Sequence, residues 1–258
     1  MRHFVAVLAL LLLPLAAFAQ APAAPAGGTR ITWLGHSVFL VQTPGGANLL
    51  IDPWLDNPKA PKDFALPAHI DAVLVSHGHA DHVGDAAGLA KKGGGQLLAV
   101  NELTQLLGWQ DMGGNVGGTF RVKDATIHFV EAVHSSSYSP TQGAPAQYAG
   151  DPIGFVIEIA NGPTLYHAGD TGLFQGMELV AKRHPIDVAI LPIGGHFTMG
   201  PDDAAAAAGL LGARTVVPMH YGTFPLLTGT PDQLRAAIGQ QKGKAKVLVL
   251  EPGKTVQL

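Results

Sequence analysis

The sequence predicts an α/β fold, an αββα sandwich in which two mixed sheets pack face to face with helices outside. Short apolar runs bounded by Gly and Pro alternate with helical patterns, and in each half of the chain strands precede helices. This order is typical of sheets covered by helices, with a site along the edge where strand ends meet. The 258 residues, 47% hydrophobic and 14% charged, are enough to bury the core of one domain.

The N-terminus is predicted to be a targeting segment. Residues 1–19 have a positive start at Arg2, an apolar stretch over residues 5–13 and an Ala17-Phe18-Ala19 cleavage site, the parts of a signal peptide. Residues 20–28 follow as an Ala/Pro/Gly-rich flexible linker. An uncleaved anchor is the alternative, but the apolar stretch is shorter than the roughly 20 residues that span a bilayer. We therefore expect an exported protein, periplasmic or secreted, with no membrane anchor after cleavage.

The chain contains no cysteine. It can carry neither a lipid anchor on cysteine nor the disulfides that export permits, so stability must come from the core and from any bound metal.

The first half of the chain is expected to form strands at residues 31–34, 38–41, 49–51, 72–75 and 97–100. Helices are predicted at residues 81–92, closed by three glycines, and at residues 102–109. The proline-containing stretch between residues 54 and 69 shows little periodicity and is expected to be a loop.

The second half is predicted to open with a hairpin, residues 120–122 against 127–130, and to continue with strands at residues 154–159, 164–168, 188–191, 216–217, 247–250 and 255–258. Helices are expected at residues 177–183 and 202–211, and a third runs to residue 241 from a capping box at Thr230. Residues 135–152 form a long loop rich in Ser, Ala, Pro, Gly and Tyr. Long loops are often functional, but the sequence does not show whether this one closes over a ligand.

The stretch Ser76-His77-Gly78-His79-Ala80-Asp81-His82 directly follows the strand predicted at residues 72–75. It holds three imidazoles and one carboxylate, the ligands that divalent transition metals take when thiolates are absent. Extended backbone would send His77 and His79 to the same side, and a helix starting near Asp81 would turn Asp81 and His82 toward a second position. The loop is therefore predicted to serve two metals; a polar loop with chance histidines is the alternative.

Three further candidates, His134, Asp170 and His220, also follow predicted strands. The end of a strand is where a sheet edge presents ligands. Each residue alone is weak support, but four strand ends that all deliver His or Asp are hard to explain by coincidence.

This series resembles the ligand series of the metallo-β-lactamase fold superfamily, and the resemblance covers about residues 29–258. Within the superfamily the chain is most similar to small bacterial metal-dependent hydrolases related to ascorbate-6-phosphate lactonase. The stretches that carry this likeness are Trp33-Leu34-Gly35-His36-Ser37, Ile51-Asp52-Pro53, His134-Ser135-Ser136-Ser137, Tyr166-His167-Ala168-Gly169-Asp170-Thr171-Gly172 and Pro218-Met219-His220-Tyr221. The resemblance implies a single hydrolase domain at residues 29–258 with the metallo-β-lactamase-like sandwich.

The resemblance also implies two divalent metal ions, with Zn²⁺ expected first and Mn²⁺ or Fe²⁺ as alternatives. One metal would be held by His77, His79 and His134, and the second by Asp81, His82 and His220, with Asp170 bridging the pair. Two metals roughly 3.5–4 Å apart can share a hydroxide, which makes a nucleophile at neutral pH.

Other polar residues are assigned less specific roles. Asp81 and Asp170, as ligands at the reacting centre, and His196, as a proton donor, are predicted to be catalytic. Asp52 is expected either to accept a hydrogen bond from a ligand imidazole or to form a turn before Pro53. The remaining candidates for substrate contact or proton transfer are His36, His167 and Tyr221. A structural role is expected for His69, His128 and His184.

The predicted function is hydrolysis of an ester-type bond (lactone, ester or phosphoester) in a small molecule by metal-activated hydroxide. The bridging acid implied by the resemblance argues against a lactamase. The net charge of −3 and the lack of a basic run argue against a nucleic-acid partner, and the lack of an Arg or Lys cluster favours a carboxylic ester or lactone. The alternatives are an iron-dependent oxidoreductase, a nuclease or phosphodiesterase, and a non-catalytic metal-binding module. The sequence leaves substrate, native metal and oligomeric state open.

Overall fold

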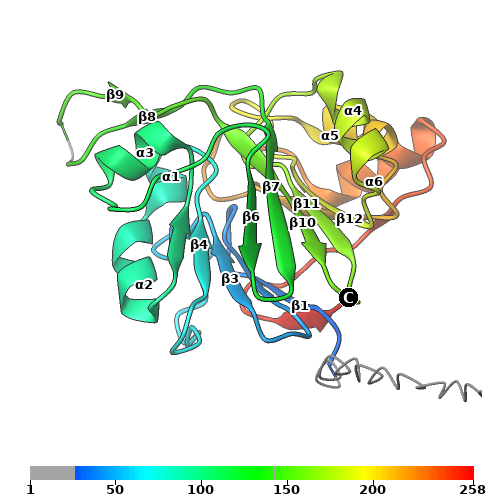
Figure 1. Ribbon diagram of the computed structural model, residues 1–258. Helices are drawn as coiled ribbons and strands as arrows, with labels where there is room; N and C mark the ends of the chain where they lie inside the picture. The colour runs from blue at the N-terminus through cyan, green and yellow to red at the C-terminus, as the bar shows by residue number, and fades with distance from the viewer. Residues whose placement is uncertain (1–26, 142) are drawn as a thin grey trace, which may run out of the picture.

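The computed structural model describes residues 27–141 and 143–258. The predicted signal segment, 1–19, and the linker up to residue 26 lie outside the described residues. Two sheets face each other and helices cover both outer surfaces (Figure 1), so the predicted α/β sandwich is confirmed.

The first sheet has the order β15-β1-β2-β3-β4-β5. Its strands are β1 (Arg30–Trp33), β2 (Phe39–Gln42), β3 (Asn48–Ile51), β4 (Ala72–Leu74), β5 (Gln96–Leu98) and β15 (Thr255–Gln257). Strands β15, β1, β2 and β3 pair antiparallel, whereas β3, β4 and β5 pair parallel. Parallel neighbours need a crossover connection, which for β4 and β5 runs through helices α1 (Ala80–Val83) and α2 (Ala86–Gly93). Helix α3 (Asn101–Leu106) follows β5.

The prediction of a single helix at residues 81–92 is wrong, because the segment forms two helices, α1 and α2, separated at Gly84. Gly84 has φ +46°, and a Cβ there would lie 2.2 Å from the carbonyl oxygen of Pro53. Only glycine combines this left-handed backbone with so close an approach. The break leaves Asp81 and His82 on a separate short turn next to the loop that carries His77 and His79.

The second sheet has the order β14-β13-β12-β11-β10-β7-β6. Its strands are β6 (Thr119–Val122), β7 (Ala125–Glu131), β10 (Ile153–Ile159), β11 (Thr164–His167), β12 (Val188–Pro192), β13 (Thr215–Met219) and β14 (Lys246–Val247). Strands β6, β7, β10 and β11 pair antiparallel, and β11 to β14 pair parallel. The loop predicted at residues 135–152 contains one small pair of its own, β8 (Ser137–Tyr138) with β9 (Gln147–Tyr148).

Helices α4 (Gly176–Arg183), α5 (Pro201–Leu211) and α6 (Pro231–Gln240) lie outside the second sheet (Figure 1). The capping box predicted at Thr230 is confirmed: the Gln233 amide donates to Thr230 Oγ1 over 3.3 Å, and the Thr230 amide donates to Gln233 Oε1 over 2.9 Å. None of the helices in the described part of the chain is long and apolar enough to cross a membrane.

The core lies between the two sheets. Phe39 of the first sheet and Phe129 and Phe155 of the second are completely or almost completely buried, and the last two pair across strands with ring centroids 5.5 Å apart. Each such side chain contributes on the order of 1.5–3 kcal/mol by leaving water. Because inward and outward residues alternate along a strand, this packing fixes the register and therefore the positions of the polar residues at the strand ends.

Candidate metal centre

The first group of possible ligands consists of His77, His79 and His134. His77 and His79 come from the loop after β4, and the Nε2 atom of His77 lies 2.9 Å from the Nδ1 atom of His79. His134, after β7, brings its ring to 5.1 Å from the ring of His77 and 5.2 Å from that of His79. The Nδ1 atom of His77 faces the hydroxyl of Ser76 at 3.1 Å, so its Nε2 atom is the one turned toward the group. Three imidazole donors within 4.8 Å of one another can hold one metal.

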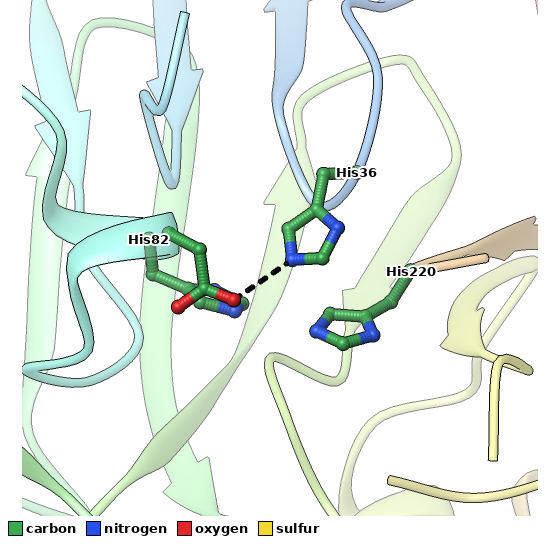
Figure 2. A group of neighbouring side chains, drawn as sticks. His36, His82 and His220 are labelled. Carbon is green, nitrogen blue, oxygen red and sulfur yellow. Dashed lines mark hydrogen bonds and ion pairs between the residues drawn. The ribbon is translucent and has the colours of Figure 1, made fainter. Parts of the chain in front are cut away.

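The second group consists of Asp81, His82 and His220, and His36 joins it. Figure 2 shows His36, His82 and His220 converging from the loop after β1, from α1 and from the end of β13. The rings of His36 and His220 are 3.9 Å apart, and the Nε2 atom of His36 lies 3.1 Å from Asp81 Oδ2. This group can hold a second metal.

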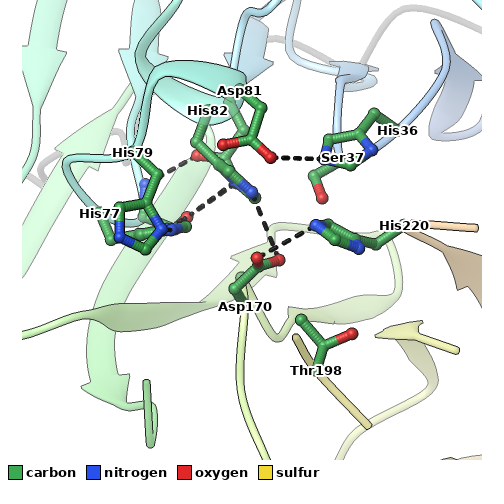
Figure 3. Close-up of polar contacts among 12 residues, drawn as sticks. His36, Ser37, His77, His79, Asp81, His82, Asp170, Thr198 and His220 are labelled. Carbon is green, nitrogen blue, oxygen red and sulfur yellow. Dashed lines mark hydrogen bonds and ion pairs between the residues drawn. The ribbon is translucent and has the colours of Figure 1, made fainter. Parts of the chain in front are cut away.

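Asp170 lies between the two groups (Figure 3). Its Oδ1 atom is 3.3 Å from His82 Nε2, while its Oδ2 atom is 3.1 Å from His220 Nε2 and 3.7 Å from His134 Nε2. Gly169 lets the chain enter this position, because its φ is +59° and a Cβ would lie 2.8 Å from Ser76 Cβ. One carboxylate therefore reaches donors of both groups, the geometry that a bridging ligand requires.

Several donor atoms of this centre are buried without a hydrogen-bond partner among the described residues. They are His82 Nε2, both ring nitrogens of His220, and Asp170 Oδ1. His220 Nε2 is 3.1 Å from Asp170 Oδ2, an ion-pair contact rather than a hydrogen bond. Buried polar atoms are nearly always satisfied, and a group of this composition is satisfied by a cation. The residues present therefore fit divalent metals of the zinc class.

Burial controls the protonation of the first group. It lowers the pKa of His77 well below the ordinary histidine value, and it also lowers the pKa of His79 and of His134. Neutral imidazoles can bind a cation without first losing a proton.

The carboxylates dominate the protonation of His82. Burial opposes a charge there, but Asp170 and Asp52 outweigh it and raise the pKa of His82 well above the usual value. Conversely, His82 and His220 hold the pKa of Asp170 well below its usual value although burial acts in the other direction. Asp170 is therefore an anion, and the site attracts positive charge, as a proton or as a metal.

Asp52 binds the ring nitrogen of His82 that faces away from Asp170. This completely buried carboxylate accepts hydrogen bonds from His82 Nδ1 at 2.9 Å, from the Ser76 hydroxyl at 2.8 Å and from the Ser76 amide at 2.7 Å. The bond from His82 Nδ1 fixes the tautomer in which Nε2 is free to face the metal. Of the two roles that the sequence left open for Asp52, the structure shows both: the hydrogen bond to an imidazole, and a turn in which the Asp52 carbonyl accepts from the Trp54 amide at 2.8 Å.

His36 lies behind Asp81 rather than in contact with substrate. It is fully buried, its Nδ1 atom is 2.7 Å from Thr223 Oγ1, and burial lowers its pKa to about 4. As a neutral ring held at both nitrogens, His36 is placed to orient Asp81 or to act as a further donor on the second metal.

The remaining sequence candidates do not line the cavity over the centre. His167 is fully buried, with Nε2 donating to the Ser37 carbonyl at 3.1 Å and Nδ1 accepting from the Gly169 amide at 3.2 Å, a structural role. Tyr221 stacks on Trp33 with ring centroids 5.3 Å apart. His196 is exposed on the loop before α5, and it is the adjacent Phe197 that lines the cavity.

The cavity above Asp170 and His220 has a volume of about 980 Å³. Its walls are mostly apolar, and they are formed by Trp54, Phe197, Phe224, Pro225 and Leu226. Trp54 and Phe224 stack with ring centroids 5.7 Å apart. Sequence reasoning missed these residues, because they come from loops that lack periodicity. The available signals were the closeness of Trp54 to Asp52, of Phe224 to His220, and of Phe197 to His196 along the chain.

The backbone is left-handed at four non-glycine candidates: His36 with φ +52°, Asp52 with φ +46°, His196 with φ +61° and His220 with φ +54°. Each such residue costs of order 1 kcal/mol or more. Strain of this kind persists where the surrounding structure holds it and clusters at functional sites, which agrees with the position of the centre.

Comparison with known proteins agrees with this geometry. The sequence family described as "Beta-lactamase superfamily domain" matches residues 47–221. A UPF0173 metal-dependent hydrolase of Myxococcus xanthus is 57% identical over 243 residues, which cover 93% of this chain and 87% of that protein. A UPF0173 metal-dependent hydrolase of Geobacillus thermodenitrificans is 42% identical over 232 residues, which cover 89% of this chain and 100% of that protein.

Solved structures give the same result. Igni18, a metallo hydrolase from the archaeon Ignicoccus hospitalis, superposes with a TM-score of 0.75 at 34% identity, covering 89% of this chain and 98% of that chain. The fold, the series of His and Asp residues at the strand ends, and these relatives all point to the same superfamily. The chain belongs to the metallo-β-lactamase superfamily, in a group of metal-dependent hydrolases.

Proposed function

We propose that this protein is a dinuclear metal hydrolase that cleaves a carboxylic ester or lactone bond in a small molecule with a sizeable apolar part. One observation carries the proposal: two groups of imidazole donors share Asp170 at the base of a cavity with apolar walls.

Two divalent cations bound here would supply a hydroxide nucleophile at neutral pH and polarise the scissile carbonyl. The chain itself contributes three things. Asp170, placed between the two groups, holds them at a fixed separation. Asp52 keeps the proton of His82 on Nδ1, away from the centre. The aromatic wall formed by Trp54 and Phe224 excludes water from one side and offers a surface for the substrate.

The composition of the cavity walls supports the proposed substrate class. Among the described residues that line the cavity there is no Lys or Arg, so a phosphate group would meet no cationic side chain there. A volume of about 980 Å³ is at the upper end of the range for small-molecule sites. An apolar acyl or aryl group of the substrate can fill it.

The test is a substrate series on protein loaded with Zn²⁺ or Mn²⁺: p-nitrophenyl esters from acetate to octanoate, matched lactones, and bis(p-nitrophenyl) phosphate. Each buried CH₂ group is worth about 0.8 kcal/mol, so kcat/KM should rise roughly fourfold per added CH₂ until the cavity is filled. Phe224→Ala should flatten this rise. The control is Met112→Ala, which removes an exposed apolar side chain away from the cavity.

Faster hydrolysis of the phosphodiester than of every ester would refute the substrate class. Iron as the tightly bound metal, with oxygen consumption and no hydrolysis, would instead favour the oxidoreductase alternative.

A further inference from the structure

We propose that His128, Glu158 and His184 form a second metal site on the outer face of the second sheet, one that binds a single divalent transition metal of the zinc class. The sequence predicted structural roles for both histidines. The geometry points to a ligand set, separate from the centre beside Asp170.

The three side chains come from two strands and a helix end. His128 lies in β7, Glu158 in β10, and His184 directly follows α4. The β7–β10 register places Val156 opposite His128 and Glu158 opposite Thr126, so His128 and Glu158 are diagonal neighbours on one face. Along β7 the buried Ile127 and Phe129 alternate with His128. His128 therefore points away from the core between the sheets, toward the side that α4 covers.

The donor atoms already converge on one point. Glu158 Oε1 is 2.8 Å from His184 Nδ1, Glu158 Oε2 is 3.2 Å from His128 Nε2, and the two rings are 4.5 Å apart. All three donors lie within 4.8 Å of one another. Two imidazoles and one carboxylate are a common ligand set for zinc, with water in the fourth position.

His128 Nε2 resembles the donor atoms of the main centre in being buried without a hydrogen-bond partner among the described residues. It is buried, it lies near a carboxylate oxygen, and it has no hydrogen bond of acceptable geometry among the described residues. His82 Nε2 and His220 Nε2 show the same combination beside Asp170. A cation placed among the three donors would satisfy His128 as it would satisfy those two.

Supporting contacts orient the set. His128 Nδ1 lies 3.0 Å from the Thr119 hydroxyl on β6, an interaction that leaves Nε2 for the metal. The hydrogen bond from His184 holds the pKa of Glu158 below its usual value, so the group is a carboxylate at neutral pH. Access exists as well, since His128 and His184 line a surface cavity of about 340 Å³ and the Glu158 side chain is 43% exposed. Arg183 and Glu131 also line this surface cavity, and their opposite charges cancel, so neither sign of charge prevails at its entrance.

The experiment counts zinc per chain by elemental analysis after dialysis of the purified full-length protein against ZnCl₂ and removal of the excess. His184→Ala and Glu158→Gln should each lower the count by one relative to wild type. Because the readout is a difference, it does not depend on how many metals the main centre holds. The matched control is His69→Ala, which also removes a histidine paired with a carboxylate, here Asp71 at 2.8 Å, and should leave the count unchanged.

A second readout guards against a variant that folds poorly. Glu158→Gln keeps the shape of the side chain. Its amide oxygen can accept from one imidazole and its NH₂ group can donate to the other, so the variant should fold. Loss of even a supporting contact costs about 10–100-fold in metal affinity, so loss of this ligand should weaken zinc binding by at least ~10-fold. A wild-type zinc count in Glu158→Gln, together with unchanged zinc affinity in a chelator competition, would overturn the proposal and leave the three residues as a hydrogen-bonded group.

Discussion

The substitution Asp52→Asn tests whether the hydrogen bond that His82 Nδ1 donates to Asp52 controls metal binding at His82 Nε2. In the wild type, Asp52 accepts from His82 Nδ1 at 2.9 Å and from the Ser76 amide at 2.7 Å. An asparagine keeps its oxygen toward the Ser76 amide and therefore turns its NH₂ group toward His82. His82 must then accept at Nδ1, so its proton moves to Nε2, the atom that faces Asp170.

The magnitude follows from that change of tautomer. A metal on Nε2 requires the remaining proton of His82 to sit on Nδ1, where Asp52 accepts it in the wild type but the NH₂ group of an asparagine cannot. Changes in the partners of ligand histidines cost about 10–100-fold in metal affinity, or about 1.4–2.7 kcal/mol. We expect the loss in the second metal, because His82 belongs to the group with Asp81 and His220.

The assay is a zinc titration against a chromophoric chelator, carried out on Asp52→Asn and on wild type in the Glu158→Gln background, so that the two binding steps followed are those of the centre beside Asp170. The matched control is Asp71→Asn at the other end of β4. Asp71 is also a nearly buried carboxylate that accepts from an imidazole, His69 Nε2 at 2.8 Å, and from a backbone amide, Asn48 at 2.8 Å. It should leave both steps unchanged.

Wild-type affinity for both metals in Asp52→Asn would refute the tautomer argument. His82→Ala separates the two explanations of that result: if it also binds both metals normally, His82 is not a ligand at all.

Three further predictions concern other parts of the molecule. Asp170→Ala should reduce ester hydrolysis by about 100-fold or more, because the carboxylate that reaches both groups is lost; activity within a few-fold of wild type would show that Asp170 does not bridge. His36→Ala should lower kcat about tenfold with little effect on KM, since His36 contacts Asp81 but does not line the cavity; steady-state kinetics would show the opposite split if His36 touched substrate. Asp71 is expected to make the stability of the protein depend on pH. Burial alone would raise the pKa of Asp71, but Lys123, the Asn48 amide and His69 outweigh burial and hold this pKa below the ordinary value. Its contribution is therefore full above the unfolded pKa of about 3.9 and is lost as the pH falls through the folded value. Urea unfolding in EDTA should find wild type and Asp71→Asn different at pH 7 and converging below about pH 4.

The fold was largely predictable, because apolar runs and turn residues report strands directly. The runs at 72–75 and 188–191 correspond to β4 and β12. The capping box at Thr230 marked the start of α6. The strand predicted at residues 247–250 is wrong beyond Val247, where β14 ends, and the loop predicted at 135–152 contains β8 and β9. The helix predicted at 81–92 is broken, and the break depends on the approach of Gly84 to Pro53. That contact joins two segments far apart in sequence, and local periodicity carries no trace of it.

The candidate ligand residues were recognisable for a different reason. His77, His79, His134, Asp170 and His220 follow strands, and Asp81 and His82 lie in the short helix α1 just after β4, so the sheet topology brings all of them to one edge. The supporting residues were harder to find. The hydroxyl of Thr223 meets His36 across 187 positions of sequence, and the Trp54–Phe224 wall joins two loops. Such pairs depend on how loops pack after the sheets form. His128 and Glu158 were overlooked for a similar reason, since their proximity follows from strand register.

In the proposed centre, one carboxylate, Asp170, joins two metals at the base of the cavity. The most direct measurement is an anomalous difference map at the zinc absorption edge, from crystals equilibrated with ZnCl₂. We expect two peaks roughly 3.5–4 Å apart, one beside His77, His79 and His134, the other beside Asp81, His82 and His220, with Asp170 between them. A single peak at the centre, or two peaks that Asp170 does not contact, would contradict a dinuclear centre bridged by Asp170.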